Sequence, residues 1–179
     1  NRVSSGIITK QKQSVLEKVL LWIRGNFFIP DARVGWVKPS IGFLRNFISE
    51  QKVEVIITSG PPHSLHLIGK SLKKETGIKW VADFRDPWTD IFYNSEMYRS
   101  KNAIQKDLAL EKKVLQAADG VLTTVGGALH DKLRVRAPRQ KFISIPNGYD
   151  TKLFQEIKRI ITKKVFHVVY TGLLTQNQD

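Results

Sequence analysis

The sequence predicts an α/β fold, an open parallel sheet with helices on both of its faces. Short apolar runs of the kind that form strands alternate along the chain with longer stretches in which apolar residues recur at helical spacing. The strand-like runs are continuously apolar, as expected of strands that are buried on both sides. Strands that are separated by helices are joined by crossovers, so we expect neighbouring strands to be parallel.

Each expected element has its own signal. The first helix carries apolar residues on one side, Pro39 opens the second helix because its fixed φ suits a first turn, and Gly77 stops the third. Residues 60–62, Gly-Pro-Pro, end the first strand. In chain order we expect a helix at 14–24, an irregular loop at 26–37, a helix from 39, a strand at 53–58, a helix at 63–75, a strand at 78–82, a helix at 102–118, a strand at 120–125, a helix at 128–136, and strands at 142–145 and 165–170.

The composition excludes several classes of protein. The 179 residues include 29 Lys and Arg, 16 Asp and Glu and no Cys, with a formal charge of +13. A disulfide scaffold, a thiol nucleophile and a disordered chain are excluded, and no apolar run approaches the roughly 20 residues of a membrane span. Two basic clusters, at 132–141 and 158–164, indicate an anionic surface such as lipid headgroups or nucleic acid, or simply a solvated face. Aromatic residues are not interleaved with them, which disfavours nucleic acid.

Ligands of such folds bind beyond the carboxyl ends of the strands, which here directs attention to residues 59–64, 83–90 and 146–150. In the first segment, Ser59 and Gly60 form a tight turn where backbone can approach a ligand, and the N-terminus of the next helix suits phosphate or sugar oxygens. His63 at this mouth can donate, accept or shuttle a proton. The alternative is a plain turn with a solvent-facing His. His63 and His66 have metal-ligand spacing, but no third ligand is near, so we expect no metal.

The second segment places three carboxylates, a guanidinium and an indole directly after a strand. Asp83 and Asp86 flank Arg85, which keeps a neighbouring carboxylate ionised and able to orient a hydroxyl or act as a weak base. Trp88 offers a flat face for a sugar. The alternative is a structural Asp–Arg pair with Trp in the core. In the third segment Asn147 and Gly148 form a turn, which is also a candidate linker between domains.

Together these segments resemble the amino-terminal, acceptor-binding lobe of a family 4 glycosyltransferase with the GT-B fold, whose lobes are Rossmann-like. The resemblance covers roughly residues 26–174 and rests on four motifs in the family's order. These motifs are Asp-Ala-Arg at 31–33 with Gly35 and Trp36, Ser-Gly-Pro-Pro-His at 59–63, Asp-Phe-Arg-Asp-Pro-Trp at 83–88, and Pro-Asn-Gly-Tyr-Asp at 146–150 with Phe154.

The resemblance implies a retaining transfer of a sugar from a nucleotide-sugar to a cell-envelope glycan or a lipid-linked acceptor, with no metal and no other cofactor. We expect His63, Asp83 and Asp86 to be catalytic, and the resemblance leaves open which of them meets the reacting hydroxyl. The expected substrate-binding residues are Ser59, Gly60, Arg85, Trp88, Asn147, Gly148 and Gly172. Many relatives work at the inner face of the membrane, so we expect a cytoplasmic location, peripheral to an anionic membrane surface, and no nucleic-acid partner.

The same resemblance divides the chain into two parts. Residues 1–154 correspond to the amino-terminal lobe without the strands that open it in the family, and 155–179 to a linker and the first strand of the donor-binding lobe. We therefore expect this piece to be inactive alone. Two alternatives stay open: a basic module that binds nucleic acid or a membrane surface, and a GT-B sugar-nucleotide epimerase. A dinucleotide oxidoreductase is disfavoured because no Gly-x-Gly-x-x-Gly follows a strand.

Overall fold

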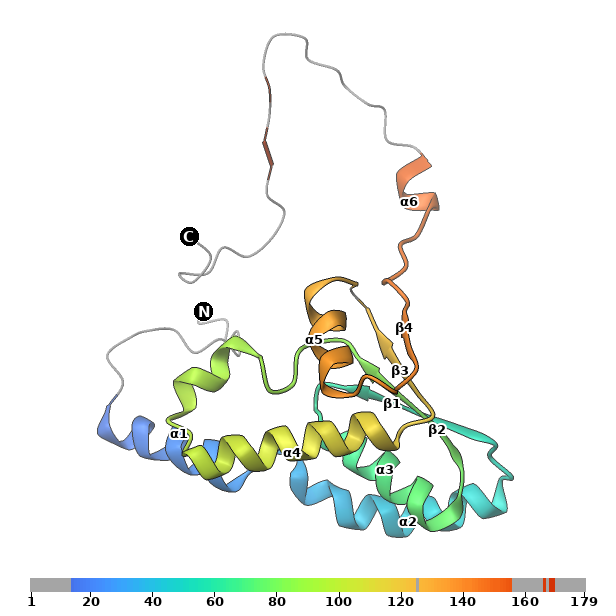
Figure 1. Cartoon of the computed structure of the whole chain (residues 1–179), viewed down its shortest axis with the longest axis horizontal. Coiled ribbons are helices and arrows are strands. Elements are labelled where there is room, and N and C mark those ends of the chain that lie inside the picture. Colours follow the sequence, from blue (N-terminus) through green and yellow to red (C-terminus); the bar gives the residue numbers. More distant parts are fainter. Residues whose placement is uncertain (1–13, 125, 156–165, 167, 170–179) are drawn as a thin grey trace. The chain divides into compact units, whose positions relative to one another are not determined.

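A computed structural model describes residues 14–124, 126–155, 166, 168 and 169 of the chain. The chain divides into two compact units, residues 1–147 and 148–179, and each is described by itself. The first unit holds a parallel sheet and its helices (Figure 1). In the second unit the described residues contain one short helix, α6 (Lys152–Gln155).

The order of elements in the first unit follows the expected alternation of helices and strands. The elements are α1 (Val15–Phe27), the short 3-10 helix η1 (Val34–Trp36), α2 (Val37–Glu50), β1 (Val55–Gly60), α3 (Ser64–Thr76), β2 (Lys79–Phe84), the 3-10 helix η2 (Phe92–Met97), α4 (Lys101–Ala117), β3 (Gly120–Thr123), α5 (Ala128–Arg136) and β4 (Phe142–Ser144). The further strand expected at 165–170 lies mostly outside the described residues, and the three described members of that run are not in a strand.

The four strands form one parallel sheet in the order β1-β2-β3-β4. The predicted fold class, α/β with an open parallel sheet of the Rossmann-like kind, is confirmed. Consecutive parallel strands with right-handed crossovers place all connecting helices on one face of the sheet. The register agrees, because Trp80, Ala82 and Val121 project to the same face and pack against Val114 of α4 and Leu133 of α5.

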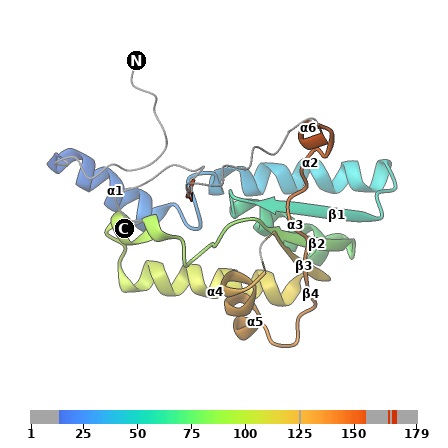
Figure 2. The same cartoon turned by 90° about the horizontal axis from the view of Figure 1, so that it is seen from above.

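The main core lies between this covered face and the helices. In Figure 1, α2, α3 and α4 all lie below the strands, and Figure 2 shows α2 running alongside β1. Trp80, Phe84 and Leu115 are fully buried there, and each large apolar side chain so buried contributes roughly 1.5–3 kcal/mol. A second cluster joins α2 to α3 through Ile48, Ile68, Leu72 and Ile78.

The opposite face of the sheet is less covered in the described part of the chain. Val55 and Ile57 of β1 project to this face, as do Val81, Leu122 and Ile143 of the strands beside it. Val55, Ile57 and Ile143 are exposed, and Ile57 is 64% exposed. Helices were expected on both faces of the sheet. In the described part of the chain, they cover one face.

The ends of several elements differ from expectation for identifiable reasons. The first helix continues three residues past Arg24, to Phe27. Gly25 in this last turn has no space for a side chain, since a Cβ there would be 2.6 Å from the Met97 carbonyl oxygen. The second helix begins at Val37, and Pro39 still falls in its first turn, where no amide donor is needed. Gly77 ends α3 as expected, in the left-handed conformation with φ of 73°.

The strands β1 and β2 both run two residues beyond their expected ends, so Ser59, Gly60 and Asp83 are strand residues and not loop residues. Among the described residues no helix is both long and apolar enough to cross a membrane.

Candidate functional site

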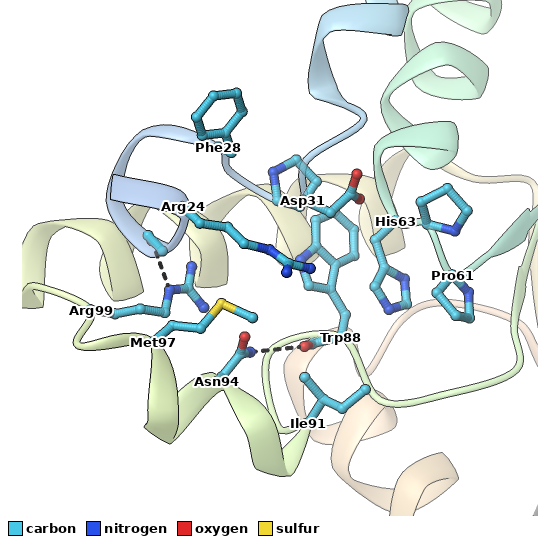
Figure 3. Close-up of a pocket in the computed structure, with 13 residues that line it drawn as sticks. Arg24, Phe28, Asp31, Pro61, His63, Trp88, Ile91, Asn94, Met97 and Arg99 are labelled. Atoms are coloured by element: carbon cyan, nitrogen blue, oxygen red, sulfur yellow. Dashed lines mark hydrogen bonds between the residues drawn. The ribbon is translucent and has the colours of Figure 1, made fainter. Parts of the chain in front are cut away.

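A pocket lies beside the carboxyl edge of the sheet, lined by the end of α1, the turn before α3 and the loop after β2 (Figure 3). Its cavity has a volume of about 60 Å³. Figure 3 shows the Arg24 side chain reaching across it toward the rings of Trp88 and His63. The polar and ionisable lining residues are Arg24, Asp31, His63, Trp88, Asn94 and Arg99.

His63 forms one wall of this pocket and is only 5% exposed. Its ring stacks on the Trp88 indole, with centroids 5.1 Å apart and planes inclined by 5°. Neither imidazole nitrogen has a hydrogen-bond partner that meets normal geometry among the described residues. Burial lowers the pKa of His63 to about 4, against weaker opposing effects of the Pro87 carbonyl and the carboxylates of Asp31 and Asp86. The ring is therefore neutral at physiological pH, with one nitrogen able to accept a proton.

His66, one turn further along α3, has a structural environment. Its Nδ1 lies 2.8 Å from the Thr58 hydroxyl, and its ring stacks on Phe84 with centroids 4.6 Å apart. It is fully buried, and burial together with the neighbouring His63 lowers its pKa to about 3. Among the residues that the structure describes, no group of three or more His, Asp or Glu side chains could hold a metal ion.

The two imidazole rings leave no space for a side chain at position 60, so a glycine is required there. A Cβ at Gly60 would lie 2.6 Å from His66 Nε2 and 2.8 Å from His63 Nδ1, closer than real contacts allow. The sequence predicted that Gly60 lets the backbone approach a ligand. In the structure, the groups that approach it are the two His rings.

Asp31 also lines this pocket, and it was not among the site residues expected from the sequence. Its carboxylate accepts hydrogen bonds from the Ser64 amide, at 2.8 Å, and from the Ser64 hydroxyl, at 2.9 Å. The N-terminus of α3, expected to be free for phosphate or sugar oxygens, is therefore occupied by a carboxylate. The only signal in the sequence was the Asp-Ala-Arg motif of the resemblance, because 33 residues separate Asp31 from its partner.

A hydrogen bond to Asp107 of α4 holds Trp88 in place. Its indole N–H donates to Asp107 Oδ1 at 2.7 Å, and Arg99 donates to Asp107 Oδ2 at 2.7 Å. Arg99 also donates to the Gly25 carbonyl at 3.2 Å, which ties α1 to the same group. Burial raises the pKa of Asp107, against the opposing influence of Arg99 and Trp88. The face of Trp88 that was expected to stack on a sugar instead packs against His63, and Trp88 is only 2% exposed.

A second ion-pair group anchors the other end of this loop. Glu111 of α4 is fully buried, accepts from the Thr89 hydroxyl at 2.9 Å and pairs with Arg136. Arg136 also pairs with Asp90 at 2.8 Å. Burial raises the pKa of Glu111, and Arg136 opposes that rise. Arg136, one of the basic residues expected on a solvated or anion-binding face, is thus engaged by two acids of the fold.

Four of the expected site residues form a separate polar network on the less covered face of the sheet. The Ser59 hydroxyl donates to Asp83 Oδ2 at 2.8 Å, and Arg85 Nε donates to the same oxygen at 3.1 Å. Arg85 then donates to the Asn147 side-chain oxygen at 3.0 Å. The structure therefore joins three strand ends that are up to 88 residues apart, Ser59, Asp83 and Asn147, through one guanidinium.

Asp86 lies on the loop between these two groups and is exposed. Its carboxylate is close enough to His63 to favour the protonated imidazole. The expected site residues thus form two groups, because His63 and Trp88 lie on the covered side of the sheet while Ser59 and Asp83 project from the other face. Gly148 belongs to the second unit, and Gly172 lies outside the described residues.

Comparison of the chain with family models, with curated proteins and with solved structures found no match.

Proposed function

We propose that this chain is the acceptor-side lobe of a glycosyltransferase that moves a sugar from a nucleotide-sugar to a cell-envelope glycan or a lipid-linked acceptor. One observation carries the proposal: a buried, neutral imidazole with no hydrogen-bond partner that meets normal geometry faces a pocket at the carboxyl edge of a parallel sheet. An unpaired polar group of this kind is unfavourable unless a ligand or water completes it. The four motifs in the family's order supply the reaction class.

In this proposal His63 receives the hydroxyl of the acceptor. A neutral imidazole nitrogen accepts the hydroxyl hydrogen bond and takes the proton as the acceptor oxygen bonds to the anomeric carbon. The bond from that carbon to the nucleoside diphosphate breaks, and the diphosphate leaves with the electron pair from the face that the oxygen enters, so that the configuration is retained. The carboxylates of Asp31 and Asp86 favour the imidazolium that results. Trp88 fixes the ring plane of His63 by stacking, and is therefore a positioning residue in this scheme.

The network around Arg85 is proposed to face the donor. The Arg85 side chain is about half exposed, although Asp83 and Asn147 engage two of its nitrogens. Arginine presents five donors in a planar fork, so further donors are suited to the phosphates of a nucleotide-sugar. The donor is a substrate, and no other cofactor is proposed. The proposed site of action is the cytoplasmic side of an anionic membrane.

The proposal is tested on the full-length enzyme, in which a donor lobe completes the site. Transfer from labelled nucleotide-sugars to isolated membranes should fall at least 100-fold in His63→Ala and at least 10-fold in Asp86→Ala, since a general base contributes about 10²–10⁴-fold. His130→Ala is the matched control, because His130 of α5 contacts Thr123 of β3, away from the pocket. Unchanged transfer in both site variants would contradict the proposal.

The second candidate is a module that binds an anionic polymer, and the +13 charge favours it. A hollow bordered by Lys112 and Arg139 would be its contact surface. Binding of duplex DNA that is tight and falls steeply with salt, in a protein without transfer activity, would favour this candidate over the first.

A further inference from the structure

Two polar side chains of the pocket, Arg24 and His63, are not engaged by the fold. Neither imidazole nitrogen of His63 has a partner of normal geometry, although the ring is only 5% exposed. The Arg24 guanidinium forms no ion pair or hydrogen bond with any residue that the structure describes. Figure 3 shows that the Arg24 side chain extends across the pocket toward the rings of Trp88 and His63. A cation and a buried imidazole therefore share one cavity, and both are available to a ligand.

The neighbouring polar side chains of the pocket already have partners. Arg99 pairs with Asp107 at 2.7 Å, and the Trp88 N–H donates to the same carboxylate. The Asn94 amide nitrogen donates to the carbonyl oxygens of Trp88, at 3.2 Å, and Thr89, at 3.1 Å. These residues give the pocket its shape, and they leave the binding of a ligand to Arg24 and His63.

Asp31, the acid that lines the pocket, does not neutralise Arg24. Its Oδ2 accepts from the Ser64 amide at 2.8 Å, and its Oδ1 accepts from the Ser64 hydroxyl and the Arg33 amide, each at 2.9 Å. The positive end of the α3 dipole favours this carboxylate further. Arg24 and Asp31 form no ion pair in the described structure. The positive charge of Arg24 therefore remains for an anion that enters the pocket.

The backbone beside Arg24 is held in a fixed position. The carbonyl of Gly25 accepts from Arg99 Nε at 3.2 Å, and a Cβ at Gly25 would lie 2.6 Å from the Met97 carbonyl oxygen. An arginine on a fixed backbone loses less freedom when it binds a ligand. Its planar fork of donors matches the paired oxygens of a carboxylate or a phosphate.

The size of the cavity limits what it can hold. Its volume is about 60 Å³, whereas one water needs roughly 10–15 Å³ by this kind of measure. Pockets that enclose a whole ligand of moderate size have about 300–1,000 Å³. This cavity therefore admits one substituent of a larger molecule, and the rest of that molecule stays outside.

We propose that this pocket binds an anionic substituent of the acceptor, a carboxylate or a phosphate, through Arg24, while a neighbouring hydroxyl of the same acceptor reaches His63. The acceptor is then an acidic sugar or a sugar phosphate. Arg24 determines specificity and takes no proton. The inference rests on the proposed function for the reacting hydroxyl. The anion site itself is measured by binding without sugar transfer, so that either can fail alone.

The test is an NMR titration of the whole chain with glucuronate, inorganic phosphate and glucose. Glucose has the hydroxyl-bearing ring of glucuronate without its carboxylate. We expect at least one of the two anions to shift the Arg24 Nε–H signal and to bind at least about 10-fold more tightly than glucose, as one hydrogen bond to a charged group provides. The anion that binds more tightly identifies the substituent as a carboxylate or a phosphate.

Arg24→Gln should weaken binding of that anion at least about 10-fold and leave glucose binding unchanged. Arg24→Lys keeps the charge but not the planar fork, so it should restore only part of the affinity. Arg45→Gln is the matched control, because Arg45 is an exposed arginine of α2 that pairs with Glu75, and its loss should leave anion binding unchanged. Circular dichroism checks that the variants fold.

Three results would overturn the proposal. Equal losses of anion affinity in Arg24→Gln and Arg45→Gln would assign the binding to the overall charge of the chain. Equal affinities for glucose and the anions, or no binding of either anion, would show that the pocket does not select an anionic group. If Arg24→Gln alone loses the anion but the full-length protein transfers no sugar, the anion site stands and the proposed function fails.

Discussion

At the scale of single residues, His63 has an unusual environment. A buried imidazole that lacks hydrogen-bond partners of normal geometry is rare in proteins. The pKa of His63 is lowered because burial outweighs the opposing effects of the Pro87 carbonyl and of the Asp31 and Asp86 carboxylates. The neighbouring His66 shares the low pKa, but its Nδ1 bonds to Thr58 and only its Nε2 is without a partner of normal geometry among the described residues. His66 is thus held by a hydrogen bond within the fold, whereas both nitrogens of His63 can form a hydrogen bond with a ligand.

The low pKa of His63 predicts a loss of stability in mild acid. Between pH 6.5 and 4 the unfolded chain binds a proton at this residue and the folded chain does not, so the unfolding free energy falls as pH falls. From pH 7 to pH 5 this contribution is about 2 kcal/mol. Urea unfolding at both pH values should show that His63→Gln loses less stability than wild type over this interval, by about that amount, while His66 maintains part of the dependence. Identical losses in the two proteins would show that His63 is not buried as described.

Residue spacing predicted part of the site. The Ser59, Asp83, Arg85 and Asn147 side chains were expected to meet because the carboxyl ends of parallel strands share one edge, and they do. Asp31 was not predicted as a site residue because it reaches Ser64 from a loop with no periodic signal. Polar residues at strand ends can be predicted from a sequence to lie near one another. A helix cap supplied by a distant loop, as Asp31 supplies to α3, cannot.

At the scale of elements, α4 fixes the loop that carries the candidate site. Asp107 and Glu111, one turn apart, are both buried and take Trp88 and Thr89 as partners. The sequence predicted α4 within one residue at each end, but it gave no prediction for the two acids of this helix. Their burial follows from cationic partners elsewhere in the chain, Arg99 and Arg136, which no helical pattern reveals.

This arrangement predicts that Asp107 is a major source of stability. Asp107→Ala leaves the buried Arg99 guanidinium and the Trp88 N–H without their partner, and removal of one member of a buried pair costs roughly 3–5 kcal/mol. Thermal and denaturant unfolding measure the loss. Glu75→Ala is the matched control: its pair with Arg45 is exposed, so the loss should stay below about 1 kcal/mol. Equal effects of the two substitutions would contradict the buried network.

At the scale of the whole molecule, the alternation of strands and helices was enough to predict a parallel sheet, since crossovers impose the direction of each strand. The strand order was not available from the sequence. Observed as β1-β2-β3-β4, it sends α3, α4 and α5 to one face and leaves Ile57 exposed on the other. Continuous apolar runs predict burial on both sides, so the second face of this sheet is expected to meet another surface.

That second face predicts self-association of the chain in isolation. In the described sheet β1 is an edge strand, and Val55 and Ile57 present apolar side chains beside its unpaired backbone groups, a combination that favours edge-to-edge pairing. Ile57→Lys should lower the light scattering of concentrated solutions, because a lysine on an edge strand opposes pairing. It should change the unfolding free energy by less than about 0.5 kcal/mol, since Ile57 is 64% exposed. Val135→Lys adds the same charge on α5 and should leave association unchanged. If both variants reduce scattering equally, the net charge of the chain controls its association. The prediction that the second face of the sheet drives self-association would then be wrong.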